Sequence, residues 1–333
     1  MKRAYVTGGT GCVGRNIVNE LLLEDWEVVV LYRTSSDISR LAGLRVKFQE
    51  VNLHDLESVR KSISGSVDAI FHAAGNTSHW SAEIEQQWKD NVLATRNLVK
   101  IALEKNVKRF IFTSTNATQD FQGYDAQFSQ RIASPYVRTK RLAELEVYAA
   151  SERGLDIVIL RPIIVIGAYD YNSYAQIFTN VAKTKLPFAF PGRIVFCHAG
   201  DVAKAHVQAF EKGRRCEHYV LGGTYSTWLD VFQRIARMMS VKSKVRTAPY
   251  WALLAVSHIL NFIAKLTTKK PVITPELVHL LHDAPDVSYY EKQKAKQDLG
   301  YTSRSLDVML HDCYKWLIKE KKLEKKVLNG EGL

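Results

Sequence analysis

The chain has 333 residues, of which 46% are apolar and 24% charged, as in ordinary soluble globular proteins. Its net charge of +12 would suit an anionic partner, but no helix-turn-helix, zinc-finger or RNA-binding signature is present, which argues against nucleic acid. The four cysteines lack metal-type spacing, so we expect free thiols, a reducing compartment and no metal site. The first residues lead directly into an apolar segment, so we expect no signal peptide and a cytoplasmic protein.

The first predicted element is a buried strand over 4–7, followed by a glycine cluster and then a helical pattern. Gly9, Gly11 and Gly14 satisfy the spacing G-x-G-x-x-G, and Gly8 precedes them. Glycines in such a turn let the backbone approach a pyrophosphate, while the start of the helix faces the anion. The stretch therefore predicts a dinucleotide site. Its expected contacts are Gly8, Gly11, Cys12, Val13 and Gly14.

Further apolar runs predict strands separated by helical patterns. The strands are expected over 26–32, 46–51, 68–72, 109–113 and 157–161, with helices over about 83–104 and from 134 onward. This alternation predicts an α/β fold with a doubly wound parallel sheet, helices on both faces and a ligand at the carboxyl ends of the strands.

Beyond Pro162 the alternation loosens, and helices are predicted over about 202–212, 229–239 and 275–282. We expect a nucleotide-binding domain over 1–162, to which some later segments return. A smaller, mostly helical substrate-binding part is expected over 163–320, and a basic tail over 321–333.

One segment, 250–266, is nearly apolar over about four helical turns, yet it contains Ser257, His258, Asn261 and Lys265. It is shorter than the roughly 20 apolar residues of a membrane-spanning helix. A buried helix of the second half and an exposed, lipid-facing helix are both consistent with the pattern. Peripheral membrane contact through this segment therefore stays open.

A second chemical motif begins at Ser134, which suits a helix N-cap, with Pro135 at the first helical position. Tyr136 and Lys140 then lie four residues apart on one helix face. An ammonium at about 4.5 Å in an effective dielectric of about 20 supplies roughly the 4 kcal/mol needed to lower a tyrosine pKa from about 10 to about 7. The pair predicts a proton donor, although an exposed Tyr–Lys pair arises often by chance.

Hydroxyl groups follow the predicted strand over 109–113, at the edge where the nicotinamide is expected. A carbonyl substrate held by Thr115 or Ser114 and by Tyr136 would accept hydride from the cofactor and a proton from the phenol. Ordinary capping of the strand end is expected of at least one of the two hydroxyls.

Together these motifs resemble the extended short-chain dehydrogenase/reductases, a family with the Rossmann fold, and the resemblance runs from Val6 to about Trp316. Within the family, the branch of dihydroflavonol 4-reductases and 3β-hydroxysteroid dehydrogenases is most similar. The matching stretches are 7–14, 71–75, 91–98, 112–115, 135–140, 160–162, 201–206 and 221–223.

The resemblance implies a role for several residues. It makes Tyr136 the acid/base, Thr115 the group that polarises the carbonyl, and Lys140 the residue that holds the nicotinamide ribose and lowers the tyrosine pKa. Asn91 matches a family asparagine, for which a structural role is equally open. Further cofactor contacts are expected at Ala73, Ala74 and Pro162.

The end of the second predicted strand bears on the choice of cofactor. NAD enzymes usually carry an acid there, but here Arg33 follows the strand and the first acid is Asp37. Arg33 would pair with a 2′-phosphate, which predicts NADP(H), although an arginine merely solvated at a strand end is the alternative. Asn52 and Leu53 stand where the family often has an aspartate near the adenine.

Three functions compete. The first is an NADPH-dependent ketone or aldehyde reductase, or the matching alcohol dehydrogenase, for a bulky apolar substrate such as a steroid, flavonoid or β-keto acyl compound. Trp80, Tyr169 and Phe188 would line its pocket. The second is a nucleotide-sugar epimerase with retained cofactor, in which Arg193 holds a phosphate. The third is a non-catalytic NADPH sensor. We expect a monomer or a homodimer.

Overall fold

Seven short strands form one parallel sheet in the computed structural model of the chain, which describes residues 1–118, 134–171, 173–183, 188–241, 245–267, 269–282 and 292–323. The order of the strands is β10-β6-β5-β4-β1-β2-β3. Chain order reverses between β1 and β4, and ligands of such sheets bind outside the strand ends at that point. The strands are β1 (Arg3–Thr7), β2 (Glu27–Tyr32), β3 (Lys47–Glu50), β4 (Ala69–His72), β5 (Arg109–Thr113), β6 (Ile157–Pro162) and β10 (Glu217–Leu221).

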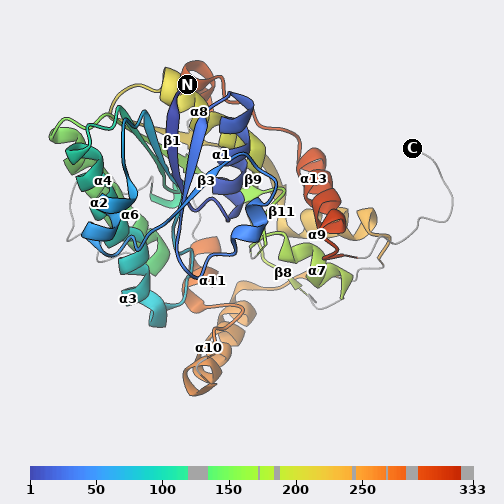
Figure 1. Cartoon of the computed structure of the whole chain (residues 1–333). Helices are drawn as coiled ribbons and strands as arrows, with labels where there is room; N and C mark the ends of the chain where they lie inside the picture. The colour runs from blue at the N-terminus through green and yellow to red at the C-terminus, as the bar shows by residue number, and fades with distance from the viewer. Residues whose placement is uncertain are drawn as a thin grey trace. The chain divides into compact units, whose positions relative to one another are not determined.

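Helices cover both faces of this sheet (Figure 1). On one face lie α2 (Leu56–Ser62), α4 (Ala94–Glu104) and α6 (Pro135–Glu152), and on the other lie α1 (Cys12–Leu23) and α8 (Ala199–Lys212). Since successive strand residues point to opposite faces, every second side chain meets the same helices. The doubly wound α/β fold expected from the sequence is confirmed.

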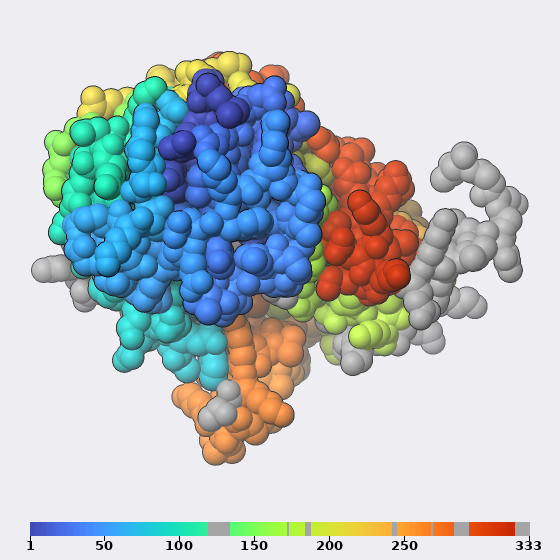
Figure 2. Space-filling view, in the orientation of Figure 1, coloured from blue at the N-terminus to red at the C-terminus, as the bar shows by residue number. Residues whose placement is uncertain are grey.

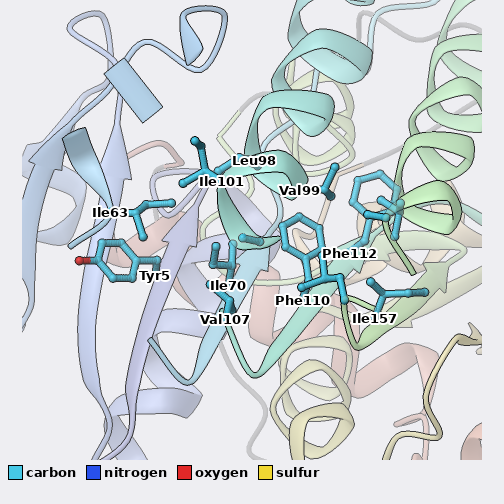
Figure 3. Packing of buried hydrophobic residues seen from close by; sticks show 14 of the residues in the cluster. Tyr5, Ile63, Ile70, Leu98, Val99, Ile101, Val107, Phe110, Phe112 and Ile157 are labelled. Atoms are coloured by element: carbon cyan, nitrogen blue, oxygen red, sulfur yellow. The ribbon is translucent and has the colours of Figure 1, made fainter. Parts of the chain in front are cut away.

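A large apolar core fills the space between the sheet and α4 and α6 (Figure 3). Aromatic side chains of β5 lie at its centre, and the helices contribute aliphatic side chains from their inner faces. Core positions in Figure 3 include Tyr5, Ile70, Leu98, Ile101, Phe110, Phe112 and Ile157, each at most 3% exposed.

The chain divides into two compact units, and the first contains Met1–Ile163, Ala199–Gly222 and Tyr290–Thr302. The later segments supply α8, β10 and α12 (Lys292–Leu299). The guanidinium of Arg109, at the start of β5, donates to the carbonyl oxygens of Ala209, Phe210 and Gly213 at 2.8–3.0 Å. A cation at the last carbonyls of α8 stabilises that helix end against the sheet.

The second unit contains Ile164–His198, Gly223–Tyr289 and Ser303–Leu333. Within it, a three-stranded sheet and a two-stranded sheet pack with helices around an aromatic core that includes Phe178, Phe196 and Trp228. Its strands are β7 (Ile164–Ile166), β8 (Phe188–Ala189), β9 (Arg193–His198), β11 (Thr224–Thr227) and β12 (Arg246–Thr247). Its helices are α7 (Gln176–Ala182), α9 (Trp228–Met238), α10 (Tyr250–Thr267), α11 (Pro275–His282) and α13 (Leu306–Lys319).

The apolar segment over 250–266 is a helix, α10, but it is not buried. Only Leu253, Ser257 and Ala264 lie inside the protein, whereas Trp251 is 72% exposed and Phe262 is 64% exposed. The reading of this segment as a core helix is therefore wrong. The hydropathy of a segment does not determine whether its apolar side chains are buried in the protein or exposed. Of the basic tail expected over 321–333, residues 324–333 lie outside the described part of the chain.

Candidate active site

The turn after β1 can be made only with glycine at two of its positions. Gly8 has φ = +70°, and a Cβ there would lie 2.7 Å from the carbonyl carbon of Ala73. A Cβ on Gly14 would lie 2.2 Å from the carbonyl oxygen of Gly8. The N–H of Gly11 donates to that same oxygen at 2.9 Å, which closes the turn.

This turn delivers the start of α1 to the switch point of the sheet. Gly11 is the N-cap and makes no side-chain cap, and the first turn, which begins with Cys12 and Val13, carries no acid. The positive end of the helix dipole is therefore not neutralised by an acidic side chain of the first turn. A bare helix start behind a glycine turn fits the diphosphate of a dinucleotide.

The neighbouring strand end is held against the turn by a chain of hydrogen bonds. Thr7 Oγ1 accepts from the N–H of Ala74 at 3.1 Å and donates to His72 Nδ1 at 2.7 Å. His72 Nε2 then donates to Thr95 Oγ1 at 3.0 Å, and Thr95 donates to the carbonyl oxygen of Asn91. Burial and the charge of a nearby lysine lower the pKa of His72 to about 3, so the ring is neutral. Ala73 and Ala74 thus border the glycine turn, as a cofactor contact requires.

Asn91 lies in a π-helical segment, η3 (Trp88–Leu93), which leads directly into α4. Its Oδ1 accepts from the N–H of Asn76 at 2.7 Å. Its Nδ2 donates to the carbonyl oxygen of Asn76 and to Thr139 Oγ1, both at 2.9 Å. Asn91 therefore connects the loop after β4 to the helix that carries Tyr136, and its geometry is that of a positioning residue.

Tyr136 occupies the second position of α6, where Ser134 is the N-cap and Pro135 the first residue, as the sequence predicts. The Thr115 hydroxyl lies close enough to the Tyr136 phenol to act on its pKa, so the two groups expected on a substrate carbonyl lie together. The ring of His79 also packs edge-on against Tyr136, with centroids 5.3 Å apart. Nothing in the sequence pattern pointed to His79.

The electrostatic expectation for this pair needs correction. Burial raises the pKa of Tyr136 to about 12, and the nearby Thr115 hydroxyl opposes that rise. Lys140 Nζ donates to the carbonyl oxygen of Thr113 at 2.6 Å and lies 4.2 Å from the ring centroid of Phe112. Burial lowers the pKa of Lys140 to about 7, while Glu144 opposes the shift. The tyrosine pKa is therefore raised and not lowered, because burial outweighs the nearby hydroxyl and Lys140 Nζ is directed to the strand.

Ser114 serves a different purpose from Thr115. Its buried hydroxyl makes no hydrogen bond within the described ranges, whereas Thr118 Oγ1 donates at 2.8 Å to the carboxylate of Glu144, which is fully buried in α6. Arg161 donates to both Glu144 oxygens at 2.8 and 2.9 Å, and Arg141 donates at 3.0 Å. Burial favours the neutral acid, but the charge and hydrogen bonds of Arg161 prevail and lower the pKa of Glu144. This ion cluster fixes α6 to β6, and sequence reasoning missed Glu144.

Glu144→Gln is expected to lower the free energy of unfolding by about 3–5 kcal/mol, because it leaves buried arginine charge uncompensated. Glu146→Gln provides the control on the same helix, since Glu146 pairs with Arg96 near the surface and the pair is worth about 1 kcal/mol or less. Urea unfolding of both variants measures the difference. Equal losses in the two variants would remove the special role of the buried cluster.

Two arginines follow β2, and one of them lies near the glycine turn. Arg33 is exposed, and its guanidinium has no hydrogen bond or ion pair to any residue in the described ranges. Arg40 lies 3.4 Å from the carbonyl oxygen of Thr10 through Nη1 and 3.2 Å from Asp37 through Nε. Hydrogen bonds from Ser39 and Arg40 outweigh desolvation and lower the pKa of Asp37. The first acid after β2 is thus engaged locally, and Arg40 is a second cation that the sequence reading missed.

The remaining expected cofactor residues lie at strand ends of the first unit. Asn52 follows β3 and accepts from the N–H of His54 at 3.1 Å, which forms a local turn. Leu53 packs on the main core, and its carbonyl oxygen accepts from Asn97 at 2.9 Å. Pro162 is the last residue of β6 and is buried.

The residues expected to contact substrate divide between the two units. Trp80 is buried in the first unit, next to His79. In the second unit, Tyr169 has φ = +69° and packs at 6.0 Å against the ring of Trp316, while Phe188 on β8 is 53% exposed. Arg193 begins β9 and is exposed. No three His, Cys, Asp or Glu side chains in the described ranges gather in a way that could hold a metal ion.

The parallel sheet, the glycine turn and the Tyr136–Lys140 helix define an enzyme that works with a bound dinucleotide. Residues 4–222 match the NAD dependent epimerase/dehydratase family, and the chain belongs to that family. It is an NAD(P)-dependent oxidoreductase or epimerase of the extended short-chain dehydrogenase/reductase type. The predicted resemblance is thereby confirmed.

Individual relatives are distant. A protein of Synechocystis sp. with the provisional name dihydroflavonol 4-reductase is 26% identical over 325 residues, 94% of this chain and 93% of that protein. Sterol demethylase protein B of Methylococcus capsulatus is 30% identical over 241 residues, 68% of this chain and 72% of that protein. The crystal structure of gox2253 aligns with a TM-score of 0.80 at 25% identity, covering 97% of this chain and 100% of that chain.

Proposed function

We propose that this enzyme uses NADPH to reduce a ketone or aldehyde on a bulky, largely apolar substrate. The observation that carries the reaction type is that the Tyr136 phenol and the Thr115 hydroxyl, just after β5, lie close enough for the hydroxyl to lower the pKa of the phenol. Two hydroxyls on adjacent elements can both bind one carbonyl oxygen, which is where charge develops during reduction.

The residues act on the substrate oxygen. When bound, the cofactor supplies a hydride to the carbonyl carbon. The Thr115 hydroxyl donates to the carbonyl oxygen and orients it, and the Tyr136 phenol transfers its proton to that oxygen as the alcohol forms. Tyr136 is left as a phenolate and takes a new proton from solvent. Lys140, one helix turn away, places its ammonium beside the strand end, where it donates to the carbonyl oxygen of Thr113 and would also hold the cofactor ribose.

The preference for NADPH is supported by charge at the end of β2. The guanidinium of Arg33 makes no hydrogen bond or ion pair within the described ranges, and Arg40 lies next to the glycine turn. The carboxylate of Asp37 accepts hydrogen bonds from Ser39 and Arg40. A 2′-phosphate would pair with an arginine fork, whereas a ribose diol would need a carboxylate that is not engaged elsewhere.

Arg33→Ala is expected to weaken NADPH binding by about 10–100-fold, because a charged hydrogen-bonding pair is lost, and to leave NADH binding nearly unchanged. Quenching of intrinsic fluorescence measures both affinities. Arg45→Ala is the matched control, since Arg45 is an exposed arginine of the following loop that pairs with Asp25. A similar loss for both cofactors would exclude recognition of the 2′-phosphate by Arg33.

The substrate class is supported by the relatives, whose names refer to a dihydroflavonol and to a sterol. Both are bulky and mostly apolar. The test is steady NADPH oxidation with a panel of steroid ketones, flavonoid ketones, β-keto acyl compounds and nucleotide sugars. Net oxidation with an apolar carbonyl supports the proposal. Turnover of a nucleotide sugar with cofactor retained and no net oxidation would identify an epimerase instead. Cofactor binding without turnover of any panel member would favour the sensor.

A further inference from the structure

Helix α10 presents an apolar face away from the protein. Trp251, Ala255, Ile259, Phe262 and Leu266 recur at spacings of four, four, three and four residues, which places them on one side of the helix. All five are exposed. We call these five residues the outer stripe. At 1.5 Å per residue it is about 22 Å long.

The exposure of the stripe is unusual for a surface helix. Ile259 is 60% exposed, Phe262 64% and Leu266 71%. Soluble proteins rarely leave a continuous apolar patch of this kind in water, and such patches mark surfaces that bind a membrane or another protein. The helix is the orange rod of Figure 1, and Figure 2 shows its exposed surface in the same colour.

The inner side of α10 is attached to the second unit at its first turns. Leu253 packs with Val278 of α11. The Tyr250 hydroxyl lies 2.8 Å from His279 Nδ1, and the ring of Tyr250 lies 3.9 Å from that of His282. These contacts attach the inner side of the first turns, so the outer stripe is on the opposite, exposed side of the helix.

The stretch of chain that contains α10 is basic. From 241 to 275 the sequence contains six Lys or Arg residues and no Asp or Glu. Of these, Lys265 lies on the flank of α10, Arg246 precedes the helix, and Lys269 and Lys270 follow it; all four are exposed. Two copies of this surface would bring like charges together, whereas an anionic bilayer complements them.

The geometry favours a helix that lies in the membrane surface over one that crosses it. By length and composition α10 is the single candidate span in the described part of the chain, with a mean hydropathy of 1.2 over 18 residues. A span needs about 20 mainly apolar residues. The flank of α10 carries His258, Asn261 and Lys265 at helical spacing, which suits the level of the headgroups.

We propose that α10 docks this enzyme on anionic lipid bilayers. The helix lies flat, with the outer stripe inserted among the acyl chains near the surface and the four exposed cations against the headgroups. Trp251 lies at the boundary between the two regions, where indole rings are favoured. This proposal does not depend on the substrate or on the direction of the reaction.

The test is flotation of the full chain with vesicles of phosphatidylcholine alone and of phosphatidylcholine mixed with phosphatidylglycerol. We expect binding to the mixed vesicles that weakens with added salt. Ile259→Ser together with Phe262→Ser should reduce partitioning at least about tenfold, because two large apolar side chains no longer insert. Lys269→Gln together with Lys270→Gln should reduce it about fivefold per lysine. Leu23→Ser is the matched control, since Leu23 is 77% exposed on α1.

Thermal unfolding of each variant establishes that it is folded, and the assay uses only folded variants. Equal flotation of the stripe variant and the parent chain would overturn the proposal, as would the absence of flotation with the mixed vesicles. Sedimentation velocity tests a second copy as the occupant. If the stripe substitutions convert a dimer to a monomer while vesicle binding is unchanged, the face is a protein interface and the membrane assignment is wrong.

Discussion

Replacement of Tyr136 by Phe is expected to lower kcat/KM for carbonyl reduction by about 10²–10⁴-fold, the usual contribution of a positioned general acid. The phenol is half-buried next to the Thr115 hydroxyl, and its pKa of about 12 keeps it protonated throughout the neutral range. It can therefore donate a proton without first being protonated by solvent. NADPH affinity should change by less than about threefold, since only one hydroxyl is removed from a large cofactor surface.

The control for this loss is Tyr148→Phe, which removes a phenol from the same helix at a buried position of the apolar core. Stopped-flow and steady-state oxidation of NADPH separate the chemical step from binding. If Tyr136→Phe turns over within about threefold of the parent chain, proton donation by Tyr136 is excluded.

Replacement of Lys140 by Met is expected to abolish most activity and, at the same time, to stabilise the protein at low pH. The pKa of Lys140 is about 7 in the folded chain, compared with the ordinary 10.5, because burial disfavours its charge. Below pH 7 Lys140 is charged in both states, and its burial lowers the free energy of unfolding because the charge is desolvated only in the folded state. This destabilisation decreases as pH rises from about 7, where the folded protein loses the proton, to 10.5, where the unfolded chain loses it too.

The Tm of Lys140→Met should therefore exceed that of the parent by about 5 °C at pH 6, with the gain shrinking toward pH 10. Lys204→Met on the exposed side of α8 is the control and should show no such trend. If the Tm difference between Lys140→Met and the parent instead grows with pH, the Lys140 charge does not destabilise the folded state. Active sites often hold such groups at the expense of stability.

Local sequence patterns predicted the parts of this molecule that local chemistry determines. The glycine turn follows from backbone sterics at Gly8 and Gly14, and the start of α6 follows from Ser134 and Pro135. The parallel sheet follows from apolar runs at regular spacing, and its first six strands were found within one or two residues. These features depend on neighbours in the chain.

Features that depend on distant contacts were missed or wrong. The sequence could not pair Glu144 with Arg161, because nothing local predicts which buried acid meets which base. It also could not predict that Arg40 contacts the carbonyl oxygen of Thr10. The tyrosine pKa was expected to fall because spacing shows the neighbouring lysine but not the burial of both groups. The roles of Arg33 and of the substrate residues stay predictions.

The return of α8 and β10 to the first unit has a consequence for biosynthesis. The edge strand beside β6, and the helix that covers α1, come from Ala199–Gly222, after the first segment of the second unit. A nascent chain that has emerged only as far as Ile163 exposes an unpaired strand edge and the apolar side of α1, which favours association with other chains. We therefore expect the first unit to complete its fold only after Gly222 has been made, and a fragment ending at Ile163 to associate with other chains.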